Sequence, residues 1–183
     1  MTNTALLIID IQNDYFSGGS WPLVDQEKAA EQATRLLEQF RAKKRPVFHV
    51  RHIADSSEAP FFVKGTVGSE IHNSVKPLES EQVIIKSEIN SFKGTDLLQA
   101  LREQNISELV VIGSMSHMCI DAAVRAAADY GFKCIVAEDA CATLDLQFND
   151  KTVPAAQVHT AFMSALSFAY AEVISTDETL SRI

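Results

Sequence analysis

Short apolar segments alternate with longer amphipathic segments along most of the chain. Six segments consist mainly of aliphatic and β-branched residues: 4–10, 46–51, 82–86, 108–113, 132–137 and 172–174. Continuous apolar runs of this length are typical of strands that are buried on both faces of a sheet. The pattern therefore predicts six strands.

Four of the intervening segments have the period of an amphipathic helix: 25–44, 95–104, 119–130 and 152–170. In the first of them, apolar residues recur three or four positions apart, at Ala29, Ala33, Leu36, Leu37 and Phe40. We expect Asp25 to cap the start of this helix and Gly131 to end the third. Strands that alternate with helices form βαβ units, so the sequence predicts a three-layer α/β/α fold with a mainly parallel sheet.

Residues 56–76 match neither period, and Pro60, Gly65 and Gly68 are spread through them. They are expected to form a long loop, and loops of this length in compact domains tend to be functional. The chain has 183 residues, of which 46% are hydrophobic, and shows no internal repeat. These features indicate a single domain that spans residues 1–183.

The charge balance argues against polyanionic partners. The chain has 16 Lys and Arg against 24 Asp and Glu, a net charge of −8, which opposes binding to nucleic acid or to anionic membranes. No apolar stretch approaches the length of a membrane span, and the first residues lack the pattern of a secretory signal. We therefore expect a cytoplasmic protein with no nucleic-acid or membrane partner.

Cofactor motifs are missing from the sequence. There is no Gly-rich dinucleotide or phosphate-binding motif and no His-Glu-x-x-His motif. His49 and His52 are three positions apart on a predicted strand, so they point to opposite faces and do not favour a shared metal site. Cys119, Cys134 and Cys141 form no Cys-x-x-Cys pair, and the last two are expected in the core. The sequence thus predicts neither a cofactor nor a metal.

Three polar residues stand at the carboxyl ends of predicted strands, where open parallel sheets bind their ligands. Asp10 ends the first strand, Lys86 ends the third, and Cys119 follows the fourth at the start of a helix. Each has an ordinary structural explanation when taken alone, as a turn acceptor, a solvated cation or a core thiol. Together they bring a carboxylate, an ammonium and a thiol to one edge of the sheet.

This combination suits nucleophilic catalysis. A thiolate is a strong nucleophile, and a helix N-terminus and a nearby cation lower the pKa of a thiol, so we expect Lys86 to lower the pKa of Cys119. Asp10 could take the thiol proton and return it to the leaving group. Backbone N–H groups of residues 113–119 could face a developing oxyanion. The pattern predicts acyl transfer through a thioester.

In five segments, taken in order, the chain resembles the isochorismatase-like family of cysteine hydrolases. The segments are ALLIIDIQNDYF at 5–16, GSEIH at 68–72, VIIK at 83–86 leading to NSFKGT at 90–95, VVIG leading to Cys119 at 110–119, and EDA at 138–140. The resemblance implies a six-stranded parallel sheet of order 3-2-1-4-5-6 and a catalytic triad of Asp10, Lys86 and Cys119. Because neighbouring strands lie about 4.8 Å apart, Lys86 would have to lean across the second strand.

The resemblance also implies a non-proline cis peptide bond between Met115 and Ser116. In this family the same turn and the N–H of the nucleophile, here Cys119, form the oxyanion hole. Family members commonly assemble, so a homo-oligomer, a dimer or a tetramer, is expected.

Departures from known subfamilies narrow the reaction. Nicotinamidases of this family carry an Asp-x-His metal motif, but here the corresponding residues 50–55 read VRHIAD, which argues against a metal-dependent nicotinamidase. Isochorismatases proper protonate a vinyl ether and need no cysteine nucleophile. The presence of Cys119 therefore favours hydrolysis of a C–N bond in a small amide or ureide. The alternatives are vinyl ether hydrolysis with Asp10 as general acid, and ligand binding without catalysis.

Side chains after the first and second strands should line the crevice beside the triad. The candidate substrate-binding residues are Gln12, Phe16, Trp21, His52 and Phe62. Each could equally be a packing residue, and their aromatic share only weakly favours a flat, partly apolar substrate.

Overall fold

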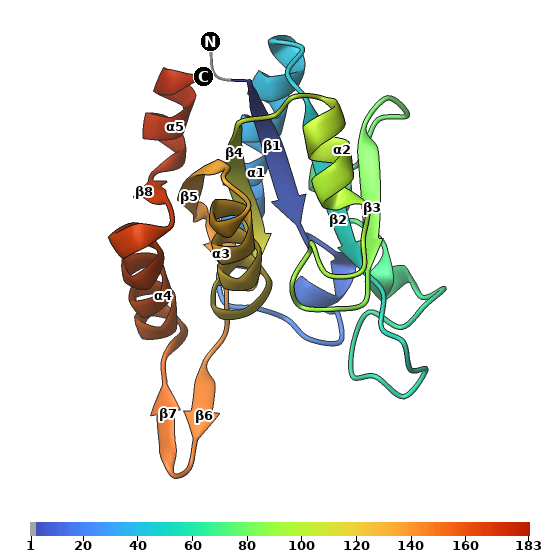
Figure 1. Cartoon of the computed structure of the whole chain (residues 1–183). Helices are drawn as coiled ribbons and strands as arrows, with labels where there is room; N and C mark the ends of the chain where they lie inside the picture. Colours follow the sequence, from blue (N-terminus) through green and yellow to red (C-terminus); the bar gives the residue numbers. More distant parts are fainter. Residues whose placement is uncertain (1–2) are drawn as a thin grey trace.

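The computed structural model describes residues 3–183 and shows one six-stranded parallel sheet covered by helices on both faces (Figure 1). The strands of this sheet are β1 (Thr4–Ile9), β2 (Val47–His52), β3 (Gln82–Lys86), β4 (Glu108–Ser114), β5 (Lys133–Ala142) and β8 (Glu172–Ile174). Their order in space is β3-β2-β1-β4-β5-β8. The expected fold class and strand order are therefore confirmed.

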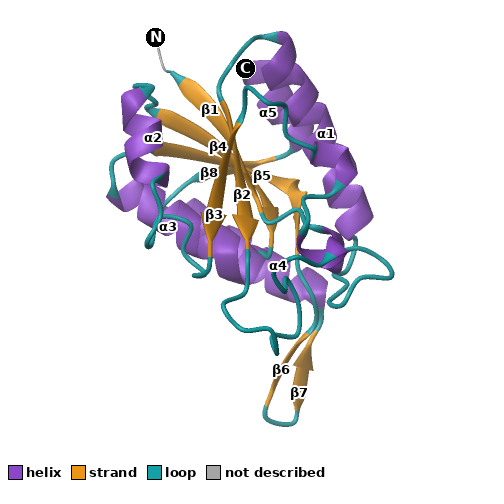
Figure 2. Cartoon of the chain, turned by 90° about the vertical axis from the view of Figure 1, so that its right-hand side faces the viewer, coloured by secondary structure: helices purple, strands orange, loops and turns teal. Residues whose placement is uncertain are grey.

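The helices form the two outer layers (Figure 2). The helices α1 (Gln26–Ala42) and α5 (Thr176–Arg182) cover one face, and α2 (Leu97–Glu103), α3 (Asp121–Asp129) and α4 (Ala155–Ala169) cover the other. Successive side chains of a strand point to opposite faces, so Leu6 and Ile8 of β1 pack toward α1 while Leu7 packs toward α2 and α3. Burial on both faces explains the continuous apolar runs.

The edge strand β3 departs from that pattern. Val83 is 41% and Ile85 is 52% exposed, so the prediction that every strand is buried on both faces was wrong here. β3 is an edge strand that pairs only with β2, so its side chains are covered less completely than those of the inner strands.

Helix starts also differ from the prediction. The helix expected over 152–170 begins at Ala155, because Pro154 disfavours helical geometry at the residue before it. The residues just ahead of it form a hairpin of β6 (Leu146–Phe148) and β7 (Lys151–Val153). Asp25 precedes α1 as predicted, but it has a φ of 56° and its side chain accepts no hydrogen bond from the helix N–H groups. Its carboxylate pairs with Lys28 at 2.6 Å instead.

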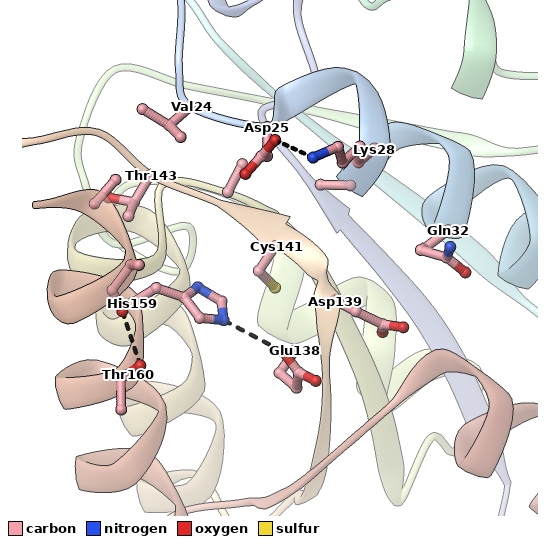
Figure 3. A pocket seen from close by; sticks show the side chains of 14 residues that line it. Val24, Asp25, Lys28, Gln32, Glu138, Asp139, Cys141, Thr143, His159 and Thr160 are labelled. Carbon is pink, nitrogen blue, oxygen red and sulfur yellow. Dashed lines mark hydrogen bonds and ion pairs between the residues drawn. The ribbon is translucent and has the colours of Figure 1, made fainter.

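The segment 56–76 is irregular, as expected, with only short 3₁₀ turns at Val67–Ser69 and Asn73–Val75, and another 3₁₀ turn, Asn13–Tyr15, follows β1. All three cysteines are buried free thiols, and Cys141 borders a pocket between α1 and α4 (Figure 3). Among residues 3–183, no helix is both long and apolar enough to cross a membrane.

β4 approaches β1 closely near the carboxyl ends of the two strands. Gly113 of β4 has a φ of +126°, and a Cβ atom there would lie 1.9 Å from the carbonyl oxygen of Ile9. Only glycine fits this position. The contact places the turn after β4 next to the end of β1.

Candidate active site

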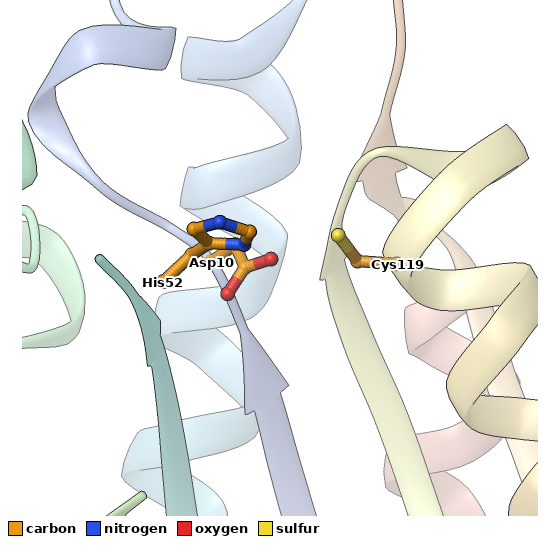
Figure 4. A group of neighbouring side chains, drawn as sticks. All are labelled: Asp10, His52 and Cys119. Carbon is orange, nitrogen blue, oxygen red and sulfur yellow. The ribbon is translucent and has the colours of Figure 1, made fainter. Parts of the chain in front are cut away.

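The carboxyl ends of three adjacent strands and one turn carry the site. Asp10 follows β1 directly with a φ of 54°, and its N–H donates to the carbonyl of Val50 at 3.0 Å. Positive φ is uncommon outside glycine but is tolerated by Asp, and such strain is often found at functional sites. His52 and Lys86 end β2 and β3 as register partners. Figure 4 shows the side chains of Asp10 and His52 directed toward Cys119, which faces them from the turn after β4.

The ammonium group of Lys86 connects these side chains. Its Nζ lies 2.8 Å from Oδ2 of Asp10, and it donates to Sγ of Cys119 at 3.2 Å and to Nδ1 of His52 at 3.1 Å. The backbone carbonyl oxygens of Glu88 and Ile89 also lie 3.1 and 3.4 Å from it, so its three N–H groups are shared among five acceptors. The side chains of Asp10 and Lys86 are fully buried, and Cys119 is 2% exposed. The structure thus brings the three predicted catalytic residues together, with Lys86 reaching across β2.

The environment keeps the charge on Lys86 and the proton on Cys119. Burial by itself lowers the pKa of Lys86, but Asp10 and Cys119 outweigh this, and the pKa is raised. Burial raises the pKa of Cys119, and the Asp10 carboxylate raises it further, by more than Lys86 lowers it. The expectation of a lowered thiol pKa was therefore wrong, because the effects of burial and of Asp10 exceed that of the cation.

An acceptor for the thiol proton is available. Oδ1 of Asp10 is buried and has no hydrogen-bond partner among residues 3–183. Burial, and then the charge of Lys86, lower the pKa of His52, so its ring is neutral at pH 7. Because Nδ1 of His52 accepts from the ammonium, the ring hydrogen is on Nε2.

The same residues meet the basic requirement for a metal site. Donor atoms of Asp10, His52 and Cys119 all lie within 4.8 Å of one another. However, the Lys86 ammonium contacts all three of them, so a metal ion would have to displace a cation that is already present. His49 lies apart from this group and contacts a carboxylate at 2.9 Å. The absence of a metal remains a prediction.

Cys119 lies in a π-helical turn, Ser116–Ile120, which we call the Cys119 turn and which leads into α3. The carbonyl of Met115 accepts from the N–H groups of Met118 and Ile120 at 3.0 and 3.2 Å. The cis peptide bond joins Ser114 and Met115, one position before the expected Met115–Ser116 bond. The prediction was wrong by one residue because β4 continues through Ser114, whose hydroxyl donates to the α1 residue Gln26 at 2.8 Å.

Comparison with known proteins identifies the family. The Isochorismatase domain model matches residues 4–178, nearly the whole chain. The chain belongs to the isochorismatase family. Members of this family are hydrolases, so this protein is an isochorismatase-family hydrolase.

Two of the similar proteins match nearly the whole chain. The Bacillus subtilis isochorismatase family protein YddQ is 56% identical over 177 residues, 97% of this chain and 98% of YddQ. A crystal structure described as that of an isochorismatase hydrolase from Oleispira antarctica has a sequence 58% identical to this chain and a TM-score of 0.95. The match covers 98% of this chain and 97% of that one. Streptothricin hydrolase of Streptomyces noursei is 34% identical over 156 residues, which are 83% of this chain and 60% of that enzyme.

In this isochorismatase-family site, three of the five predicted substrate-binding residues lie close to one another. Phe62 lies 5.8 Å from His52 and 4.9 Å from Phe61, and Trp21 lies 5.1 Å from Phe61, measured between ring centroids. Tyr15 joins them at 4.6 Å from Phe62. We call Tyr15, Trp21, Phe61 and Phe62 the aromatic cluster. Through His52, it adjoins the Lys86 ammonium.

The other two predicted residues hold the surrounding loops. The Gln12 side chain donates to the carbonyls of His52 and Ser69 at 2.8 and 2.9 Å and accepts from the N–H of His52 at 2.8 Å, so both of its amide hydrogens are used within the protein. Phe16 stacks on His72 at 3.7 Å and packs with the core under α1. Contact of either residue with substrate remains a prediction.

Two residues of the site were missed by the sequence reasoning. Burial, Asp10 and Cys119 all raise the pKa of Tyr15 well above its usual value, so its phenol stays neutral beside the triad. The buried carboxylate of Asp14 accepts from the N–H of Phe62 at 2.7 Å and fixes that residue at a φ of 58°. Both follow Asp10 within five positions, so their closeness to the strand end was the available signal.

Proposed function

We propose that this protein hydrolyses a C–N bond of a small amide or ureide through a thioester on Cys119. The observation that carries the proposal is the Lys86 ammonium, which contacts both the Asp10 carboxylate and the Cys119 sulfur inside a buried site. The family membership supports a hydrolase, and the relative named for its action on streptothricin supports a nitrogen-containing substrate.

The first half of the reaction forms the thioester. Asp10 takes the proton of the Cys119 thiol as Sγ attacks the carbonyl carbon, and the carbonyl oxygen becomes an oxyanion. The tetrahedral intermediate collapses when the C–N bond breaks and protonated Asp10 gives its proton to the departing nitrogen. The amine or ammonia then leaves, and the acyl group remains on sulfur.

The second half releases the acid. Asp10, again a carboxylate, takes a proton from a water molecule that attacks the thioester. The C–S bond breaks, and the proton held by Asp10 returns to sulfur. Lys86 remains an ammonium throughout, because its raised pKa opposes proton loss, and it stabilises the thiolate each time the sulfur carries negative charge.

The turn around the nucleophile is the proposed oxyanion hole. As the resemblance implies, the backbone at Met115 and Ser116 forms one part of this hole. The N–H of Cys119 is the proposed hydrogen-bond donor to the oxyanion. Electrostatic stabilisation of this kind is usually the largest contribution to acyl transfer, and loss of one donor costs about 10²–10³ in kcat.

The aromatic cluster is the proposed wall of the substrate pocket. Trp21 is 37% exposed while Phe62 is fully buried, so the cluster extends from the surface toward His52 and Lys86. Such a wall favours a flat, partly apolar substrate. We also propose that the protein acts in the cytoplasm as a homo-oligomer, a dimer or a tetramer, and binds neither nucleic acid nor membranes. Light scattering on the purified protein tests the assembly.

A substrate screen with two cysteine variants tests the reaction. Amides, ureides and vinyl ethers are incubated with the parent, with Cys119→Ala and with the control Cys134→Ala, which makes the same change at a buried residue near the start of β5, at the other end of the strands from the triad. We expect release of amine or ammonia by the parent and by the control, and an acyl adduct on Cys119 in the mass spectrum. Turnover of an amide by Cys119→Ala would overturn the thioester route.

The remaining outcomes identify the alternatives. Turnover of a vinyl ether that survives in Cys119→Ala but is lost in Asp10→Asn would establish ether hydrolysis with Asp10 as general acid. Binding of a compound without turnover of any member of the screen would indicate a ligand-binding protein. Either result would refute the amide proposal.

A further inference from the structure

A pocket of about 490 Å³ lies between α1 and α4, beside the end of β5 (Figure 3). Glu138, Cys141 and His159 line it. The pocket lining contains none of the triad residues Asp10, Lys86 and Cys119. However, His159 also contacts Ser116 of the Cys119 turn. One residue of α4 therefore belongs both to the pocket wall and to the surroundings of Cys119.

An irregularity of β5 directs these side chains. In the pairing of β4 with β5, Val111 is opposite Val136 and Gly113 is opposite Cys141. β4 advances by two residues between these pairs while β5 advances by five, so β5 contains three extra residues. Bulges of this kind redirect side chains and are common beside active sites. Here Glu138 is turned toward α4, while the neighbouring Asp139 accepts from the N–H and hydroxyl of the α5 residue Thr176.

A chain of polar contacts leads from the pocket to the Cys119 turn. Nε2 of His159 lies 3.4 Å from Oε2 of Glu138, and Nδ1 of His159 lies 2.9 Å from Oγ of Ser116. The Ser116 hydroxyl either donates its one hydrogen to Nδ1, or donates it to the carbonyl of Ala142 and accepts from an N–H at Nδ1, and in both arrangements the ring and the hydroxyl are hydrogen-bonded. The carbonyl of Ala142 is the other neighbour of this hydroxyl, at 3.2 Å.

Ser116 is fully buried and belongs to the Cys119 turn, three positions before the nucleophile. Because this hydroxyl is buried, its contacts with the His159 ring and with the Ala142 carbonyl both favour one placement of the turn, and the contact with the ring is the shorter one. A second contact acts on the same turn, since Nδ1 of His117 lies 2.7 Å from the hydroxyl of Thr143. The turn is therefore held from the side of β5 and α4, opposite to Asp10 and Lys86.

We propose that His159, oriented by Glu138, is a positioning residue that fixes the Cys119 turn through Ser116. This inference rests on the proposed function for its effect on rate, because only a reacting thiol gains from exact placement. A displacement of about 1 Å in a catalytic group can reduce a rate by 10²-fold. Removal of the imidazole is expected to lower kcat, while substrate binding at the aromatic cluster is affected little.

The test compares His159→Ala, His159→Asn and the control Thr160→Ala. Thr160 is the next residue of α4, lines the same pocket, and donates only to the carbonyl of Ala156 at 2.8 Å within its own helix. Asn places an amide near the position of Nδ1, so it can replace the contact with Ser116. Each variant is measured for kcat, for KM and for hydrogen exchange of the peptide spanning residues 114–120.

We expect His159→Ala to lower kcat at least about tenfold, with KM changed less than about threefold. Exchange at residues 114–120 should become faster, with both effects largely reversed in His159→Asn and absent in Thr160→Ala. If His159 acts through Ser116, the double variant Ser116→Ala/His159→Ala should be no slower than the worse single variant.

Three results would overturn the proposal: parent-like kcat and exchange in His159→Ala, a loss that His159→Asn does not reverse, or additive losses in the double variant. The exchange measurement needs no substrate. If the parent hydrolyses no amide, the proposed function fails, while exchange in the Ala and Asn variants still decides whether His159 holds the turn. If His159→Ala does not fold, Ser116→Ala, which removes the other side of the same contact, takes its place in the comparison with the parent, His159→Asn and Thr160→Ala.

Discussion

Replacement of Lys86 by Met isolates the contribution of the buried ammonium. Met keeps an unbranched chain of similar length but cannot donate a hydrogen bond or carry charge. In the variant, the carboxylate of Asp10 loses the cation that lies 2.8 Å away, and both side chains are fully buried. The acceptor Nδ1 of His52 and the sulfur of Cys119 lose the same donor.

The expected cost follows from the burial of the pair. At 2.8 Å the attraction between the two charges is about 6 kcal/mol for an effective dielectric constant of about 20, and desolvation of both groups offsets part of it. Removal of one member of a buried pair typically costs about 3–5 kcal/mol, because the other charge remains buried and unpaired. For a chain of this length, that lowers the melting temperature by roughly 6–20 °C.

Urea unfolding at pH 7, followed by circular dichroism, measures the difference. The control is Lys93→Met, which removes an ion pair of the same length, 2.8 Å, between largely exposed partners, and should cost no more than about 1 kcal/mol. In the double variant Asp10→Asn/Lys86→Met, no buried charge is left unpaired. It should therefore be more stable than Lys86→Met, since neutral replacement of a buried pair is often tolerated.

Two results would refute this reasoning. One is a loss below about 1 kcal/mol for Lys86→Met, which would place the pair in the same class as exposed pairs. The other is a double variant no more stable than Lys86→Met, which would show that the unpaired carboxylate is not the source of the loss. The rate of amide hydrolysis, if the proposed function holds, should fall in all variants of Lys86.

Three further predictions concern the thiol, the strand contact and acid stability. Burial and the Asp10 carboxylate raise the pKa of Cys119, so iodoacetamide should label this thiol slowly at pH 7. Asp10→Asn should accelerate labelling at pH 8, with the labelled cysteine located by peptide mass. Equal rates in the parent and in Asp10→Asn would contradict this. Gly113→Ala should lower the free energy of unfolding in urea by about 3 kcal/mol or more, because its Cβ would lie 1.9 Å from the carbonyl oxygen of a β1 residue. The control Gly65→Ala also has a positive φ, but its Cβ would meet no atom within 4 Å, so the loss should be about 1–2 kcal/mol. Burial raises the pKa of Glu81, but hydrogen bonds from an α1 guanidinium, a backbone N–H and a histidine lower it to about 2, so its contribution to stability is present above pH 4.5 and is lost as the pH falls toward 2. Glu81→Gln should therefore flatten the dependence of the unfolding free energy on pH in this range, and an unchanged slope would contradict the assignment.

The strands could be predicted because burial on both faces leaves a direct trace in the sequence. The segment 82–86 matches β3 at both ends, and 172–174 matches β8. Helix ends were less accurate, since they depend on local geometry such as the positive φ at Asp25. The short helix α5 was missed, although Ser175 and Glu178 have the spacing of a capping box and the Ser175 hydroxyl accepts from the N–H of Glu178 at 3.2 Å.

The triad could be predicted because strand direction alone brings residues at the carboxyl ends to one edge of the sheet. The strand order and the length of the Lys86 side chain, which reaches across β2, then bring it to Asp10 and Cys119. The protonation state of the thiol could not be predicted in the same way. It depends on how completely water is excluded and on how close the carboxylate comes, and neither quantity is set by residue type.

The contacts that hold the turn around Cys119 depend on strand register, which explains why they were not predicted. Glu138 belongs to a segment that carried the family resemblance, but three extra residues in β5 decide that its side chain meets His159. His159 meets Ser116 across 43 positions of the chain. Together with the bond from Ser114 to Gln26, this contact holds the turn between α1 and α4. The sheet thus determines where Cys119 lies, while residues of the two flanking helices contact the segment that carries it.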